Sequence, residues 1–266
     1  MSEQVKNKRT IHLDIVCGLL VLWMIFGDHL RYMSDVQSFP GYDILKKVFF
    51  FFMSWFFFKS GMFYSKKRTV KDVIRHDWQK LGQTYLIGCG LAIILQLVYQ
   101  TMSGLFDAKT FFIRNLIDVF NHGGASWNIA LWFLISLYVV KILFRWAIDK
   151  VPAIIIAVVS VLISWMLYKM GWFRPACIGN VPLGLFFYSC GYLMKDLQYQ
   201  RLTIIIASIV GGGIFVLSAV KSFNFRINMV GSEDVYFVVI IACICNILIF
   251  NNIFKIITPP PIRVYW

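Results

Sequence analysis

Long apolar stretches alternate with short polar and basic stretches along this chain. A helix needs about 17–25 predominantly apolar residues to cross a bilayer, and about eight stretches of the sequence meet that need. The pattern predicts an all-α, polytopic membrane helix bundle, folded as a single membrane-embedded domain over residues 1–266. The predicted spans are 13–30, 48–64, 84–100, 128–147, 152–170, 178–194, 203–222 and 235–254.

Composition favours a membrane protein over a soluble one. Of the 266 residues, 59% are hydrophobic and 15% are charged, and the mean hydropathy is +0.71, which is too apolar for a soluble domain. The net charge of +13 is divided among short clusters between the apolar stretches, so it does not indicate nucleic-acid binding. More Lys and Arg residues fall on one side when both termini are placed in the cytoplasm, which the positive-inside rule favours.

Two further patterns refine this picture. The six cysteines lie mostly inside apolar stretches, without metal-ligand spacing, and are predicted to be reduced packing residues. No metal is expected. The segment 104–127 is too polar to span, but its "FFIRNLIDVF" has helical periodicity, so we expect a helix lying on the outer membrane surface.

The first predicted span carries ionisable residues that a passive anchor would lack. Asp14 stands near its start, and Asp28 and His29 near its end. Each charge in hydrocarbon is disfavoured by about 3 kcal/mol. On a helical projection Asp28 lies about 40° from Asp14, and His29 about 60° to the other side, so the three residues share one broad face. They are either interfacial residues satisfied by water and headgroups or, for the Asp-His pair, a general base with its supporting acid.

The second span and the loop after it supply candidate binding residues. Lys59 either reaches the inner headgroups or pairs with Asp14, and Ser60 bonds either a ligand or its own helix. Gly61 allows a close backbone approach. The basic loop after this span is either a solvated positive-inside loop or a site for the phosphates of a nucleotide-bearing donor. Its candidate phosphate ligands are Lys67, Arg68, Arg75 and Lys80.

Four motifs in order resemble those of the acyltransferase 3 family of integral membrane proteins. They are "LDIVCGLLVLWMIFGDH", "FFFFMSWFFFKSGMFYSKKR", "SWNIALWFLISLYVVK" and "VPLGLFFYSCGYLMKD", and they cover nearly the whole chain. The resemblance implies a bundle of about ten membrane helices, two more than are predicted here. It also matches Asp14, Ser60, Gly61 and Trp132 to positions in the family's motifs.

The resemblance implies an enzyme that takes an acyl group, typically acetyl, from acyl-CoA on the cytoplasmic side. The acceptor would be a hydroxyl of a cell-surface glycan or of its lipid-linked precursor, and the location a bacterial-type inner membrane. We expect His29, assisted by Asp28, to deprotonate this hydroxyl. His122, in "NHGGASW", is a second candidate base on the acceptor side, although a loop histidine more often faces solvent.

The chain departs from the family pattern at two positions in the first span. Cys17 stands where members usually have Arg or Lys, and Asp28 stands where their histidine falls, with His29 one residue later. A local bulge that turns the helix by about 100° would direct His29 inward. Two alternatives therefore stay open: a catalytically impaired relative of the family, or a transporter or flippase of sugar-linked lipids, whose pathway would also carry intramembrane charges.

Overall fold

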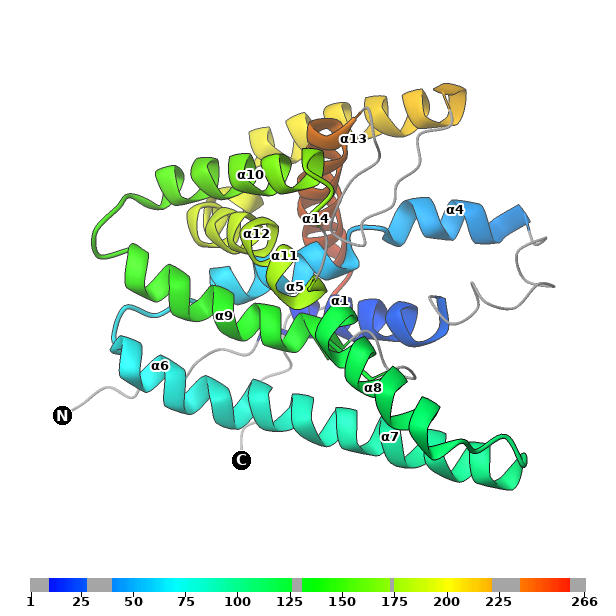
Figure 1. Ribbon diagram of the computed structural model, residues 1–266. Helices are drawn as coiled ribbons and strands as arrows, with labels where there is room; N and C mark the ends of the chain where they lie inside the picture. Colours follow the sequence, from blue (N-terminus) through cyan, green and yellow to red (C-terminus); the bar gives the residue numbers. More distant parts are fainter. Residues whose placement is uncertain (1–9, 28–39, 126–130, 173–174, 222–234, 259–266) are drawn as a thin grey trace, which may run out of the picture. The chain divides into compact units, whose positions relative to one another are not determined.

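The protein is helical throughout the described part of the chain. The computed structural model describes residues 10–27, 40–125, 131–172, 175–221 and 235–258, and these form helices without a β-strand (Figure 1). The elements are α1 (Ile11–Leu22), the π-helical turn η1 (Trp23–Gly27), α4 (Pro40–Phe49), α5 (Phe52–Met62), α6 (Val70–Asp77), the π-helical turn η2 (Trp78–Gly82), α7 (Gln83–Met102), α8 (Ala108–His122), α9 (Trp132–Ala147), α10 (Ala153–Lys169), α11 (Ala176–Gly179), α12 (Val181–Met194), the 3₁₀ turn η4 (Leu197–Tyr199), α13 (Arg201–Lys221) and α14 (Tyr236–Ile257).

Each predicted span overlaps a helix, and this agrees with a helical membrane protein. Among the described residues, four helical stretches are long and apolar enough to cross a membrane: Val70–Met102, Cys177–Met194, Arg201–Ser218 and Tyr236–Ile257. The first of them joins α6, η2 and α7 into one long rod (Figure 1). The count of eight spans and the cytoplasmic position of both termini stay predictions.

The second predicted span, 48–64, is not one continuous helix. α4 ends at Phe49 and α5 begins at Phe52, with Phe50 and Phe51 forming a turn between them. Both turn residues are buried, and the Phe51 ring lies 4.9 Å from the ring of Phe250. An unbroken run of phenylalanines gives no local stop signal, so this break comes from tertiary packing.

Two compact units make up the described chain. The first consists of the described parts of Met1–Phe52, Asp196–Ile227 and Ser232–Trp266. In this unit α14 contacts both α1 and α13. Stacking of Trp23 on Phe49, with ring centroids 5.1 Å apart, joins η1 to α4.

A polar cluster closes one end of this first unit. The side-chain amide of Asn251 donates to the side-chain oxygen of Gln198 (3.0 Å), and that of Asn252 to the Gln198 backbone oxygen (2.7 Å). The hydroxyl of the neighbouring Tyr199 lies 2.9 Å from His12 Nε2, and burial raises the pKa of Tyr199 to about 12. These bonds fasten η4 to α14 and α1.

The second unit is built from Met53–Lys195. Within it α12 packs between α10 and α9, and α9 also contacts α6 and η2. α5 crosses α12 backbone to backbone: a Cβ on Gly61 would overlap the Tyr188 carbonyl, and a Cβ on Gly191 would overlap the Phe58 carbonyl. The close approach expected for Gly61 is therefore confirmed.

The helix expected in 104–127 is present as α8. Asp107 caps its first turn by accepting from the backbone amide of Thr110 (3.1 Å), and Gly123 ends it with a left-handed φ of 76°. The surface position of this helix stays a prediction. All six cysteines are free, and four of them are buried, which confirms their assignment as unpaired packing residues.

Candidate functional site

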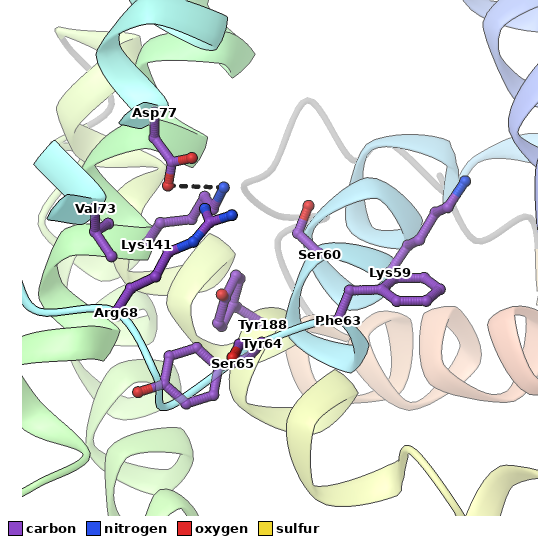
Figure 2. A pocket seen from close by; sticks show the side chains of 10 residues that line it. All are labelled: Lys59, Ser60, Phe63, Tyr64, Ser65, Arg68, Val73, Asp77, Lys141 and Tyr188. Atoms are coloured by element: carbon purple, nitrogen blue, oxygen red, sulfur yellow. Dashed lines mark ion pairs between the residues drawn. The ribbon is translucent and has the colours of Figure 1, made fainter. Parts of the chain in front are cut away.

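A cavity of about 290 Å³ opens in the second unit among α5, α6, α9, α12 and the loop between α5 and α6. Charged and hydroxyl side chains share its lining with few apolar ones (Figure 2). The lining residues are Lys59, Ser60, Phe63, Tyr64, Ser65, Arg68, Val73, Asp77, Lys141 and Tyr188.

Two local features hold the walls of this cavity in place. The glycine crossing of α5 and α12 puts Ser60, the neighbour of Gly61, on the same cavity as Tyr188. On the opposite wall, Thr69 and Asp72 form a capping box at the start of α6, which satisfies two backbone amides of the first turn. The backbone oxygen of Arg68, the residue before the cap, accepts from Arg145 Nε (2.6 Å).

A buried ion pair joins α6 to α9 at the cavity. Lys141 Nζ lies 2.8 Å from Asp77 Oδ2, and the side chains are 26% and 2% exposed, respectively. The other carboxylate oxygen of Asp77 lies 3.1 Å from His76 Nδ1. A carboxylate this deeply buried needs a cationic partner. The charge of Lys141 therefore serves to neutralise Asp77.

The remaining two cations of the cavity differ in how they are held. Lys59 extends away from the Asp77–Lys141 pair (Figure 2), and its Nζ lies 5.0 Å from the centre of the Trp55 ring. Arg68 is exposed, and its Nη1 lies 3.0 Å from His76 Nδ1. Three cations against one carboxylate leave the lining positive, and together with its hydroxyls this suits an anionic, hydrogen-bonding ligand.

The structure brings three of the predicted binding residues together at the cavity and leaves the other five outside its lining. Lys59, Ser60 and Arg68 line the cavity. The other predicted phosphate ligands are exposed and do not line it; they are Lys67, Arg75 and Lys80. Of the four residues predicted as phosphate ligands, Arg68 is the one that lines the cavity.

Trp132 and His122 lie near one another at the start of α9, away from this cavity. A Cβ on Gly123, the residue after His122, would lie 2.6 Å from Trp132 Cβ and 3.0 Å from Cys177 Cβ. His122 Nδ1 lies 3.1 Å from Asp118 Oδ1, one turn earlier on α8. The ring of His122 is therefore oriented by a carboxylate, whereas the sequence had placed it in a loop.

The residues of the first span belong to the other unit. Asp14 lies in the first turn of α1 and is partly buried, and both alternatives for Lys59, pairing with Asp14 or reaching the inner headgroups, stay open. Asp28 and His29 lie outside the described residues. The described helix reaches Gly27, directly before them, and its last five residues form the π-helical turn η1.

Sequence reasoning did not assign a role to Asp77, Lys141, His76 or Tyr188. A signal was present for Lys141, since a lysine inside the apolar stretch "LYVVKILF" requires a partner. Asp77 stands beside many basic residues and resembled part of a solvated loop. Its burial became visible only when α6 was placed against α9.

The helices agree with a helical membrane protein, one of whose two units holds a cavity lined largely by charged and hydroxyl residues. Comparisons of the chain with known protein families, with curated proteins and with solved structures find no match. The resemblance to acyltransferase 3 proteins stays a prediction from the four motifs.

Proposed function

We propose that this protein is a membrane O-acyltransferase that moves an acyl group, in the simplest case acetyl, from acyl-CoA to a hydroxyl of a cell-surface glycan or of its lipid-linked precursor. The proposal rests on the four motifs and is supported by the local geometry of the first span and by the positive cavity. The bacterial-type inner membrane is part of the same proposal.

The observation that carries the proposal is the π-helical turn η1 at Trp23–Gly27. A π turn holds one residue more than an α turn, and each residue of a helix advances the direction by about 100°. A residue after the turn therefore points where its predecessor would point in an unbroken α-helix. A turn with one extra residue corresponds in size to the one-residue displacement of His29 in the sequence relative to the family pattern, and this correspondence is the basis of the proposal, His29 itself lying outside the described residues.

The cavity supports the donor side of the reaction. Arg68 and the hydroxyls beside it suit the phosphates of a nucleotide-bearing thioester, and Arg binds phosphate with several directed N–H donors. Lys59 and Ser60 line the same space. On the acceptor side, His122 and Trp132 are the residues that we assign to contacts with the sugar.

In the proposed reaction His29 removes the proton of the acceptor hydroxyl while its oxygen attacks the thioester carbonyl. The new ester C–O bond forms, the C–S bond breaks, and the departing thiolate takes the proton from the imidazolium. Asp28 assists by stabilising this imidazolium. Because a thioester is already activated, positioning and one base supply much of the required acceleration.

The test is transfer of labelled acetyl from acetyl-CoA to membrane glycans. His29→Ala is expected to lower the rate by about 10²- to 10⁴-fold, and Asp28→Ala to lower it less. A variant with Ile25 deleted converts the π turn to an α turn and moves the histidine to position 28, so it should keep activity. An inserted alanine at the same place should abolish it. Wild-type rates in His29→Ala would contradict the proposal.

A further inference from the structure

One ring nitrogen in the second unit has two partners with opposite requirements. His76 Nδ1 lies 3.0 Å from Arg68 Nη1 and 3.1 Å from Asp77 Oδ1. A guanidinium only donates hydrogen bonds, and an ionised carboxylate only accepts them. Nδ1 accepts from Arg68 when it is unprotonated and donates to Asp77 when it carries a proton, so it serves one partner at a time.

Arg68 is a cavity cation with a weak electrostatic link to Asp72: hydrogen bonds from Thr69 and, to a smaller extent, the charge of Arg68 lower the pKa of the Asp72 carboxylate. Asp77 is taken by Lys141 at 2.8 Å, and no carboxylate among the described residues lies within ion-pairing distance of Arg68. Its guanidinium contacts the imidazole, while its backbone is held by Arg145 and by the capping box that follows. The backbone is thus fixed, and the side chain can turn from His76 toward an anion in the cavity.

We propose that His76 is a positioning residue that holds Arg68 away from a phosphate in this cavity when Nδ1 is unprotonated and releases it when Nδ1 carries a proton. The proton enters from solvent, since the His76 side chain is 37% exposed. The released Arg68 binds the phosphate, and His76 then donates to Asp77. The identity of the phosphate's carrier as acyl-CoA rests on the proposed function.

Other charged residues lie on the element of His76 and on the elements next to it or packed against it. They are Lys67 and Arg68 on the preceding loop, Lys71, Asp72, Arg75 and Asp77 on α6, Lys80 on η2, and Lys141, Arg145 and Asp149 on or after α9, which contacts α6. Among them, Arg68 and Asp77 share the Nδ1 atom. Protonation adds positive charge beside Arg68 and frees the Arg68 guanidinium, and both effects favour anion binding at lower pH.

The experiment measures CoA binding to the full chain in nanodiscs of neutral lipid by calorimetry. We compare wild type, Arg68→Gln, His76→Gln and, as a control, Arg75→Gln, which removes the same charge from an exposed residue outside the cavity. Arg68→Gln is expected to weaken binding by about ten- to hundredfold, and Arg75→Gln by less than about threefold. Equal losses in both arginine variants would overturn the site.

The pH arm isolates the role of His76. As the pH is lowered from about 8 to about 5, wild-type affinity should rise relative to His76→Gln. That variant corrects for the titration of the phosphate itself. In wild type labelled with ¹⁵N-histidine, which has four histidines, CoA should move the Nδ1 signal of His76 toward the protonated form. An unchanged Nδ1 signal on saturation, or the same pH dependence in both proteins, would overturn the proposal.

A last comparison distinguishes a nucleotide phosphate from the phosphate of a lipid headgroup. If phosphatidylglycerol in the nanodisc leaves CoA binding unchanged, the nucleotide is supported. If it displaces CoA from wild type but not from Arg68→Gln, a lipid headgroup is the occupant and the CoA assignment is wrong. These readouts need no turnover, so absent acetyl transfer with intact Arg68-dependent binding would refute the proposed function and leave this inference standing.

Discussion

At the scale of single residues, Gly61 and Gly191 determine how closely α5 approaches α12. Each faces a backbone carbonyl of the other helix at a distance that leaves no room for a Cβ. A backbone carbonyl cannot turn aside as a flexible side chain can. Two cavity side chains depend on this crossing. Ser60 is the residue before Gly61, and Tyr188 supplies the carbonyl that faces Gly61.

Gly61→Ala is therefore expected to destabilise the protein by about 1–3 kcal/mol, as overpacking does. Gly90→Ala is the matched control, because its helical glycine in α7 has open space around the Cβ position, and helix propensity then favours alanine by up to about 1 kcal/mol. Thermal unfolding in one detergent measures both. Equal stability of the two variants would contradict the backbone crossing.

At the scale of elements, α8 shows how one residue sets a helix terminus. Hydrogen bonds from Thr110, through its side chain and its backbone amide, hold the pKa of Asp107 below its usual range. A lowered pKa in the folded state means that the stabilisation is present above the unfolded value, near pH 4, and is lost as pH falls through the folded value.

We expect hydrogen-exchange protection of the first turn of α8 to fall a few-fold as the medium is acidified below about pH 4. Asp107→Asn should keep the cap and lose this pH dependence, because asparagine caps helices without a charge. Asp107→Ala should lower protection at every pH. A first turn in Asp107→Asn that responds to acid as strongly as wild type would show that another group is responsible.

The π-helical turns are a second feature at this scale. η1 ends the described part of α1, and η2 directly follows Asp77. A π turn changes the direction of all later residues on a helix, and such turns are frequent at functional sites. In η2, a Cβ on Gly82 would overlap the Trp78 ring. The absence of a side chain at Gly82 therefore leaves room for the indole.

At the scale of the whole molecule, the Asp77–Lys141 pair links two helices whose sequences are far apart. It packs α6 against α9 while closing one wall of the cavity. A buried charge that loses its partner is costly, whereas replacing both partners by apolar residues of similar volume is often neutral. A double-mutant cycle therefore distinguishes the contribution of the pair to stability from its contribution to ligand binding.

Asp77→Leu and Lys141→Met are each expected to destabilise the protein by about 1–3 kcal/mol, and the Asp77→Leu/Lys141→Met double variant to recover most of that loss. Chemical denaturation in mild detergent measures the three. Strictly additive single effects would mean that the two side chains do not interact. The stable double variant then serves to ask whether CoA binding requires the pair.

The sequence by itself determined that the chain consists of apolar helices. The hydropathy and the length of each apolar stretch are local properties, and they can be compared directly with the thickness of a bilayer. The sequence also identified Arg68, Ser60 and Lys59, since ionisable and hydroxyl residues are conspicuous beside apolar runs, and it predicted the close approach at Gly61.

Only the tertiary structure decided which of the four predicted phosphate ligands lines the cavity, because Lys67, Arg68, Arg75 and Lys80 look alike in the sequence until the helices are placed. It likewise revealed the burial of Asp77, the shared nitrogen of His76 and the break at Phe50 and Phe51. Each of these depends on contacts between segments distant in sequence, which no local pattern encodes.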